Sequence, residues 1–445
     1  MLDTVKNFAN KYFKCFPVYL VGGGVIDYLC DRIPKDFDIE IYGLSIDEIS
    51  DILKYNGFDV NFVGASFGII KTVYKNIDLD ISVPRVDNRI GKGHKGFDCS
   101  FPSNISPKEA SRRRDLTINS IFLDLHTLDI HDPWGGVEDL SKGVLKATDS
   151  TTFIEDPLRV LRVMQLLARK GKIVDSDTVD LCISMVDSFV DLPQERVFEE
   201  FVKLFSASRP SKGLRFLVDS NWIFCFPELE SLIGCKQHPE WHPEGDVWEH
   251  TLRVVDWAAK EKENLDEDWR LAFMFGALLH DIGKPVVVSD DFTCHGHDLA
   301  GEPLARSFME RITRDKELID RVVCIVRNHM RCGQLSFGDA KKPGWKRLHN
   351  DLRLDVAASL SKCDSLSRYS EEYVSGMEHE PSRVALQYFD EFGKKPIKPV
   401  LMGRHLIDAG MKPGPEFGKI LKKAYDIQIE DGISCPDTLL RLVNG

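Results

Sequence analysis

A run of three glycines, Gly22–Gly24, separates an apolar segment, residues 19–21, from a second segment, residues 25–30. The first is predicted to be a buried strand and the second a helix, so the glycines form a strand-to-helix turn. Because Gly22 and Gly23 have no side chain, the backbone can approach a phosphate there. The N-terminus of the helix adds free N–H groups and a positive dipole end. An ordinary turn without a ligand is the alternative interpretation.

Carboxylates follow this turn at strand spacing. Asp36 and Asp38 are two residues apart at a predicted strand, so both side chains point to one face of a sheet. A second predicted strand, residues 77–83, carries Asp78 and Asp80 in the same spacing. Mg²⁺ binds carboxylates together with substrate phosphates, and two such ions can serve nucleotidyl transfer. We expect Asp36, Asp38 and Asp80 to be Mg²⁺ ligands and to form the catalytic set. Asp78 is the alternative to Asp80, and solvated acids are the competing interpretation.

The charge and hydropathy of the chain exclude several functions. It has 58 basic and 70 acidic residues, and a net charge of −12 argues against a protein that coats long nucleic acids. Basic residues nevertheless gather in residues 85–114 and 157–172, which suits the binding of phosphate groups. The sequence contains no apolar run of the roughly 20 residues that a membrane span needs, no signal peptide and no CxxC pair among its 11 cysteines. We therefore expect a cytoplasmic protein with no membrane partner.

The periodicity of apolar residues indicates four parts and an α+β fold class. Residues 1–150 alternate apolar and polar runs broken by Gly and Pro, which predicts a small mixed-sheet domain. Residues 151–237 have helical periodicity, and the turn-rich segment 238–245 marks a domain boundary. We expect further helices over residues 247–375, followed by a helical tail over residues 376–445. The whole is predicted as a mixed-sheet domain followed by all-α parts.

The N-terminal motifs resemble the nucleotidyltransferase palm shared with DNA polymerase beta. They are more similar still to those of class II tRNA CCA-adding enzymes and bacterial poly(A) polymerases. The segments that carry the resemblance are LVGGGVIDYL (residues 20–29), RRRDLTINS (112–120), DPWGGVEDL (132–140), FIEDPLRVLR (153–162) and LPQERVFEEF (192–201).

The sequence departs from the family pattern at one position. Where the family has an arginine before Asp27, this chain has Ile26, so one cation is missing near the expected triphosphate. Lys71 or Arg113 could supply that positive charge instead.

The resemblance implies roles for the polar residues of these motifs. Arg113 and Arg114 would grip the triphosphate, Asp115 would contact the ribose hydroxyl, and Asn119 would support that loop through backbone hydrogen bonds. The implied nucleotide-binding set is Gly22, Gly23, Asp27, Lys71, Arg113, Arg114, Asp115, Asn119, Glu155, Asp156, Arg159 and Arg162.

Selection of the incoming base would fall to Asp156 and Arg159, which are three residues apart on a predicted helix. A carboxylate accepts a hydrogen bond from the amino group that C and A share, and a guanidinium donates to the ring acceptor beside it. The resemblance gives Glu155 the task of holding the arginine. A surface ion pair between residues i and i+3 is the alternative.

A second candidate site lies in the third part of the chain. His280 and Asp281 are adjacent at the end of an apolar helix, and this pairing of imidazole and carboxylate suits a divalent transition metal. With His250 and Asp364 they resemble the H…HD…D pattern of HD phosphohydrolases, which implies that these four residues hold a divalent ion such as Mg²⁺, Mn²⁺ or Ni²⁺. A degenerate HD fold that only binds tRNA is the alternative.

Other histidines lie near the same pattern. His297 and His329 resemble the additional histidines of the HD superfamily. We expect His295 to be a neighbour of the site, and His238 and His242 to be linker residues without a role in it.

These resemblances predict a CCA tRNA nucleotidyltransferase with an HD phosphohydrolase domain of phosphatase or 2′,3′-cyclic phosphodiesterase type. Its partners would be the tRNA 3′ end, CTP and ATP, and the protein would be a monomer or homodimer. Poly(A) polymerase is the nearest alternative, and an enzyme that adds only CC or only A is another. An HD phosphohydrolase with a non-catalytic RNA-binding N-terminal region, or a tRNA-binding protein without activity, would belong to other classes.

Overall fold

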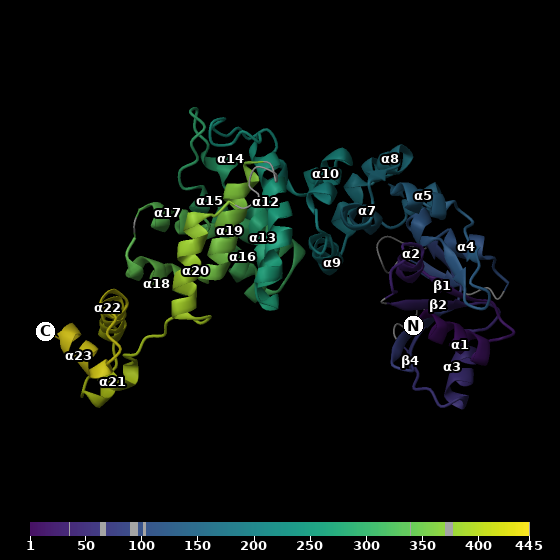
Figure 1. Ribbon diagram of the computed structural model, residues 1–445, viewed down its shortest axis with the longest axis horizontal. Coiled ribbons are helices and arrows are strands. Elements are labelled where there is room, and N and C mark those ends of the chain that lie inside the picture. The colour runs from purple at the N-terminus through teal and green to yellow at the C-terminus, as the bar shows by residue number, and fades with distance from the viewer. Residues whose placement is uncertain are drawn as a thin grey trace. The chain divides into compact units, whose positions relative to one another are not determined.

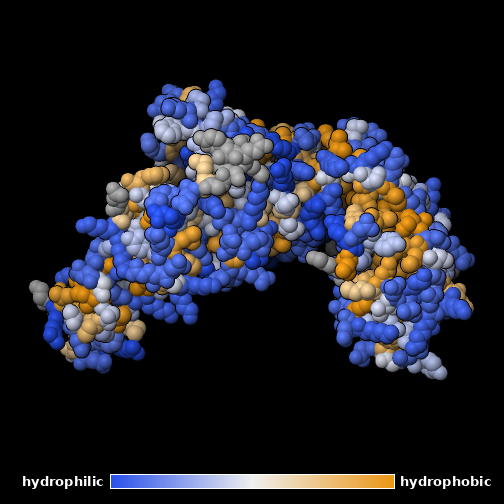
Figure 2. Space-filling view, in the orientation of Figure 1, coloured by the Kyte–Doolittle hydropathy of each residue, from blue (hydrophilic) through white to orange (hydrophobic). Residues whose placement is uncertain are grey.

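The computed structural model describes residues 1–34, 36–62, 68–89, 97–100, 104–338, 340–369 and 377–444. The chain divides into two compact units, residues 1–207 with 212–225, and residues 208–211 with 226–445. The described strands belong to the first unit, and the second is helical (Figure 1), which confirms the predicted α+β class. The visible surface is mostly hydrophilic, with separate hydrophobic patches (Figure 2). Within the described ranges, no helix combines the length and apolar character that a membrane span requires.

A seven-stranded mixed sheet forms the N-terminal unit, in the order β3-β4-β5-β2-β1-β8-β9. β2 and β5 are parallel, and the other neighbours in this sheet are antiparallel. The three strands predicted from the sequence are its centre, β1, β2 and β5. The sheet's strands are β1 Val18–Val21, β2 Phe37–Ile41, β3 Asn61–Phe62, β4 Ile69–Tyr74, β5 Ile77–Ser82, β8 Phe122–Asp124 and β9 Ile130–His131, while β6 Val86–Arg89 pairs with β7 Phe97–Ser100.

Alternation along β2 separates a hydrophobic core from a polar face. Phe37, Ile39 and Ile41 belong to a buried cluster with residues of α1 Leu2–Tyr12 and α3 Ile46–Tyr55, which lie side by side in Figure 1. Because successive strand residues point to opposite faces, Asp38 and Glu40 point away from that core. The same alternation in β5 turns Asp80 to the polar face.

The polar face is bordered by short helices and loops. α2 Gly23–Leu29 follows β1 directly, and a Ser106–Glu109 capping box starts α4 Pro107–Ser111. The remaining helices of the unit include α7, which begins two residues after Asp156, and α9, which carries the ERxxxE pattern, Glu195 to Glu200, of the segment LPQERVFEEF. Their bounds are α5 Gly136–Lys142, α6 Ser150–Phe153, α7 Leu158–Arg169, α8 Ser176–Ser184, α9 Gln194–Phe205 and α10 Ser211–Asp219, with 3₁₀ turns at Thr117–Asn119, Val186–Asp191 and Trp222–Cys225.

The predicted all-α body contains one small departure. β10 Val144–Leu145 and β11 Ile173–Val174 form a two-stranded parallel pair on either side of α7 in the sequence. Each is two residues long, so the part remains helical in character.

The second unit consists of helices around the candidate histidine site, followed by a tail. α12 is capped by Asp246 and α16 by Asp315. The tail has its own small core of Leu401, Leu406, Ala424 and Leu439. The helices are α11 Pro227–Glu230, α12 Val247–Glu261, α13 Glu267–Leu279, α14 Lys284–Val287, α15 His297–Ile312, α16 Lys316–Asn328, α17 Arg331–Phe337, α18 Lys342–Asp351, α19 Leu354–Ser367, α20 Glu380–Phe392, α21 Gly403–Asp408, α22 Glu416–Asp431 and α23 Pro436–Asn444, with a 3₁₀ turn at Lys262–Asn264.

Candidate active sites

The predicted acidic residues meet at the centre of the sheet. Asp38 and Asp80 are register partners on the parallel strands β2 and β5. Asp78 lies two residues earlier on β5, opposite Val73 of β4, and is exposed. Asp36 immediately precedes β2 and is exposed as well. The structure therefore brings Asp80, rather than Asp78, beside Asp38.

The electrostatics of this carboxylate site favour a bound cation. Burial and the negative charges of Asp80 and Asp36 raise the pKa of Asp38 to about 6. Lys71, expected near the triphosphate, is 3.0 Å from the Asp80 carboxylate and offsets part of that charge. Three carboxylates with one ammonium group leave an excess of negative charge, and oxygen donors of this kind fit Mg²⁺.

The glycine turn keeps space open beside these carboxylates. Gly22 has a φ of 68°, and a side chain there would place its Cβ 3.3 Å from Oδ2 of Asp38. A Cβ on Gly23 would meet no heavy atom within 4 Å. Gly22 is thus required by both its backbone conformation and its closeness to Asp38.

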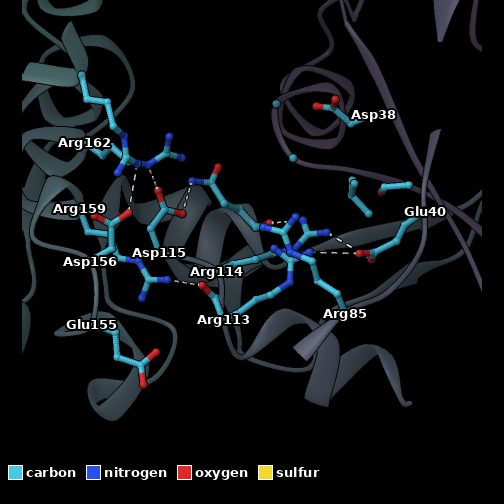
Figure 3. Close-up of a pocket in the computed structure, with 16 residues that line it drawn as sticks. Asp38, Glu40, Arg85, Arg113, Arg114, Asp115, Glu155, Asp156, Arg159 and Arg162 are labelled. Carbon is cyan, nitrogen blue, oxygen red and sulfur yellow. Dashed lines mark hydrogen bonds and ion pairs between the residues drawn. The ribbon is translucent and has the colours of Figure 1, made fainter. Parts of the chain in front are cut away.

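A cavity of about 510 Å³ extends from Asp38 across the polar face. Figure 3 shows arginines of the RRRD turn between Glu40 on one side and Asp115 on the other. This concentration of cations beside a carboxylate site suits a polyphosphate. The lining includes Gly22, Gly23, Asp38, Glu40, Arg85, Arg113, Arg114, Asp115, Asn119, Glu155, Asp156, Arg159, Arg162 and Arg196.

Glu40 orients two of these arginines, and the sequence analysis missed it. Its buried carboxylate lies 3.4 Å from Arg113 and 3.3 Å from Arg114, and it accepts a hydrogen bond from Tyr42. A sequence pattern that could have predicted Glu40 was present, because Glu40 continues the two-residue spacing of Asp36 and Asp38.

Asp115 is fully enclosed by donors. Arg162 donates to it at 2.7 Å and the Asn119 amide at 2.8 Å, so that its pKa falls to about 2 although burial favours the neutral acid. Asn119 thus supports the loop through its side chain, and its carbonyl accepts a hydrogen bond from Arg114. A continuous series of polar contacts runs from Glu40 through Arg114, Asn119 and Asp115 to Arg162.

The expectation that Asp156 and Arg159 share a helix face is wrong for Asp156. α7 begins at Leu158, because the residue before Pro157 is disfavoured in the helical region. Asp156 instead accepts from the Leu158 N–H and pairs with Arg196 at 3.2 Å. Both Asp156 and Arg159 still line the cavity.

Arg159 is held by backbone carbonyls. Its guanidinium donates to the carbonyl oxygens of Thr152 and Arg113. Glu155 lines the same cavity and contributes a favourable charge, but no hydrogen bond joins it to Arg159 within the described part of the chain. Arg196, from the ERxxxE segment, is a further cavity residue that sequence reasoning missed.

Two other residues lie apart from this cavity. The Asp27 carboxylate pairs with Arg32 at 3.2 Å and approaches Lys170 at 3.9 Å, and Asp27 is not among the residues that line the cavity. Ile26, where the family has arginine, is buried. Residues 90–96 and 101–103 of the predicted basic stretch 85–114 lie outside the described residues.

The histidine cluster forms where helices of the second unit converge. His250 comes from α12, His280 and Asp281 follow α13, and Asp364 comes from α19. His297 begins α15, and His329 follows α16. Gly283 permits this convergence, because a Cβ there would be 2.1 Å from the carbonyl oxygen of His297.

Both carboxylate oxygens of Asp281 face imidazoles. Oδ2 is 3.2 Å from Nε2 of His280 and 3.6 Å from Nε2 of His250. Oδ1 is 3.2 Å from Nε2 of His297 and 3.8 Å from Nε2 of His329. Asp364 lies 3.2 Å from Nε2 of His250. The structure thus brings the four predicted ligands together and adds His297 and His329.

The tautomers leave these imidazoles ready to bind a metal. Nδ1 of His280, His297 and His329 each faces a backbone carbonyl at 2.6–2.9 Å, so each Nε2 points into the cluster. Nε2 of His297 and Nε2 of His329 are only 3.0 Å apart. Nε2 of His250 and Nε2 of His280 are buried without a well-aligned hydrogen-bond partner in the described residues, and Oδ2 of Asp281 has Lys284 as an ion-pair partner at 2.6 Å. This donor set fits a divalent transition metal.

The segment before α12 completes the cluster, and its histidines are more than linker residues. Glu244 accepts from Nδ1 of His250 at 2.6 Å and from Nδ1 of His242 at 2.9 Å. His238, His242 and His295 line a cavity beside Asp281. The prediction that His238 and His242 lack a place in the site is wrong, because the segment 237–244 contacts His250 and Lys284 and lines the cavity beside Asp281.

Family models match three parts of the chain. Residues 18–146 match a family model described as the poly A polymerase head domain, and residues 173–233 match a probable RNA and SrmB-binding site of polymerase A. Residues 247–369 match the HD domain.

Relatives extend over most of the chain. The multifunctional CCA protein of Vibrio campbellii is 33% identical over 319 residues, which are 70% of this chain and 75% of that protein. The multifunctional CCA protein of Nitrosospira multiformis is 32% identical over 315 residues, which are 70% of this chain and 72% of the relative.

Solved structures share the fold. The Bacillus stearothermophilus CCA-adding enzyme in complex with CTP has a TM-score of 0.67 at 18% identity, covering 100% of this chain and 98% of its own. The Thermotoga maritima CCA-adding enzyme complexed with tRNA has a TM-score of 0.58 at 18% identity, covering 100% of this chain and 93% of its own.

The raised pKa of Asp38 predicts that the carboxylate site costs stability. Ionisation of Asp38 is harder in the folded protein than in the unfolded chain, so the penalty grows from about pH 4 to about pH 6 and is complete above that. In metal-free protein at pH 8, Asp38→Asn should raise the free energy of unfolding by about 2 kcal/mol. Urea denaturation across this pH range measures the gain, which should vanish near pH 4. Asp78→Asn is the matched control, and an equal gain there would contradict the assignment.

The histidine cluster predicts a metal-dependent rise in melting temperature. Ni²⁺ or Mn²⁺ added to metal-free protein should raise Tm by several degrees, because an ion that binds only the folded state stabilises it. His280→Ala should abolish most of this shift. Differential scanning calorimetry gives the measurement, and His295→Ala, which removes an exposed imidazole, should leave the shift intact. A full shift in His280→Ala would place the metal elsewhere.

Proposed function

The chain belongs to the multifunctional CCA protein family, and on this premise we propose that it adds C, C and A to the 3′ end of tRNA from CTP and ATP. The observation that carries this proposal is the position of Asp38, the register partner of Asp80, at one end of a cavity lined by Arg113, Arg114 and further arginines. The tRNA 3′-hydroxyl would attack the α-phosphate, and pyrophosphate would leave. Because its proposed substrate is tRNA, we propose a cytoplasmic location for this activity.

We propose that Asp36, Asp38 and Asp80 hold Mg²⁺. When bound, Mg²⁺ lowers the pKa of an attacking hydroxyl and neutralises phosphate charge. The protein supplies orientation: Glu40 holds Arg113 and Arg114 toward the cavity, where they would grip the triphosphate. Asp115 keeps Arg162 in place and would contact the ribose.

Base selection would rest on Asp156, Arg159 and Arg196. Two backbone carbonyls fix the orientation of the Arg159 guanidinium, so its remaining N–H groups are presented in one geometry. Arg196 orients the Asp156 carboxylate by donating a hydrogen bond to it. Acceptor and donor together match the amino group and adjacent ring acceptor of C and A, which U and G do not present in that arrangement.

Extension of tRNA lacking its CCA end, with each labelled nucleotide in turn, tests the transfer reaction. CTP alone should add two residues, and ATP should add one residue after them. Asp80→Ala should reduce kcat at least 1,000-fold, whereas Asp78→Ala should change it less than threefold, because only Asp80 stands beside Asp38. Long A tracts without C would make the protein a poly(A) polymerase, and equal losses in the two variants would contradict the proposed ligand set.

We also propose that the histidine cluster is a metal-dependent phosphohydrolase site. His250, His280, Asp281 and Asp364 would hold the ion, with His297 and His329 on the second oxygen of Asp281. A metal here supplies a nucleophilic hydroxide and polarises the phosphoester. Glu244 orients His250 from behind.

Separation of the two activities tests the second site. His280→Ala should abolish hydrolysis of 2′,3′-cyclic AMP, because it removes one of the four proposed ligands, and it should leave CTP incorporation into tRNA unchanged. Asp38→Ala is the converse control, with incorporation lost and hydrolysis retained. Undiminished hydrolysis in His280→Ala would show that another site performs it.

A further inference from the structure

The segment of residues 237–244, here called the strap, forms one side of the cavity at the histidine cluster. The Gln237 side chain accepts a hydrogen bond from Lys284 at 2.7 Å, and Lys284 also contacts Asp281 at 2.6 Å. At the other end, the buried Glu244 accepts from His242 and His250. The strap is therefore attached at both ends to residues of the metal cluster.

The cavity between strap and cluster has two chemically different parts. Its volume is about 340 Å³, which is within the range of sites for small molecules. One part contains the carboxylates of Asp281 and Asp364 with the cations Lys284 and Arg368. Positive groups beside a metal site suit a phosphoester.

The other part of the cavity is aromatic and apolar. Trp241 of the strap and Phe292 of the loop after α14 line it, together with Met330. The Trp241 side chain is 62% exposed, so its ring face is available to a ligand. An aromatic ring a short distance from a phosphate site is the usual platform for a nucleobase.

Phe292 adds an independent observation. Its φ is 63°, a left-handed conformation that is unfavourable for a bulky side chain. The turn that holds it is closed by hydrogen bonds between Ser289 and Thr293. Packing does not require an aromatic ring here, because Phe292 is 36% exposed. Strain of this kind persists where a residue serves a site.

We propose that Trp241 and Phe292 bind the nucleobase of the substrate, so that the histidine cluster acts on nucleotide phosphoesters, such as a 2′,3′-cyclic phosphate at an RNA end, in preference to small phosphoesters without a base. This rests on the proposed hydrolase function of the cluster. In the reaction, the oxygen of water bonds to phosphorus, one P–O bond of the ring breaks, and the released ribose oxygen takes the proton.

Two cyclic phosphodiesters that differ in the base test this proposal. With full-length protein and Ni²⁺, KM should be lower for 2′,3′-cyclic AMP than for glycerol 1,2-cyclic phosphate. Trp241→Ala should raise KM for cyclic AMP about tenfold, since loss of one stacking ring costs 1.4 kcal/mol or more, and should leave KM for the glycerol ester unchanged. Trp241→Phe should restore most of the affinity. Phe337→Ala, which removes an 81% exposed ring outside the cavity, is the matched control.

A second variant separates binding from folding. Asn tolerates the left-handed conformation better than Phe, so Phe292→Asn should leave the unfolding midpoint equal or higher while KM for cyclic AMP rises. Equal KM changes for both esters, or none, would overturn the base-binding role. If wild-type protein hydrolyses neither ester, the proposed hydrolase function is wrong. Equilibrium dialysis with adenosine 3′-monophosphate then tests the base site by itself. Binding weakened by Trp241→Ala would support the base site, and no binding would overturn it.

Discussion

Alternation along strand β2 is the constraint on which the N-terminal unit depends. Phe37, Ile39 and Ile41 must face the core under α1 and α3, and this forces Asp38 and Glu40 to the opposite face. Charged groups on that half-buried face need compensation. Glu40 finds it in two arginines, whereas Asp38, beside Asp80, keeps an excess of negative charge. The proposed nucleotidyl transfer would use this division, because the Asp38–Asp80 pair would hold metal while Glu40 orients the arginines proposed to bind phosphate.

The two sites accommodate the negative charge of a buried carboxylate in different ways. In the carboxylate site, the pKa of Asp38 is raised, which marks a group that an incoming cation would relieve. In the histidine cluster, burial opposes the charge of Asp281, but His280 and Lys284 hold its pKa well below the usual range. Burial and His280 lower the pKa of His329 to about 4, so its imidazole stays neutral. A neutral His329 imidazole and an ionised Asp281 carboxylate are donors that suit a transition metal, and oxygen ligands alone form the better site for Mg²⁺.

Spacing along the chain predicted those features of the fold that depend on local geometry. The strand-glycine-helix turn, the carboxylates on β2 and β5 and the change to helices after residue 150 follow from periods of 2 and 3.6 residues. The choice of Asp80 over Asp78 agrees with the strand register. Asp156 was misplaced because Pro157 delays the start of α7. Glu40 and Arg196 were missed since their function comes from partners 40 or more residues away.

The sequence alone therefore determined the chemistry: which acids, arginines and histidines the protein carries, in an order that resembles CCA-adding enzymes joined to an HD domain. Only the tertiary structure decided which groups meet. Strand register put Asp80 next to Asp38, and helix convergence brought His297 and His329 to Oδ1 of Asp281. The tertiary structure also places residues 237–244, which the sequence suggested were a linker, against the histidine cluster. The physical reason is that local periodicity sets the direction of a side chain, whereas its partners depend on the packing of elements far apart in the chain.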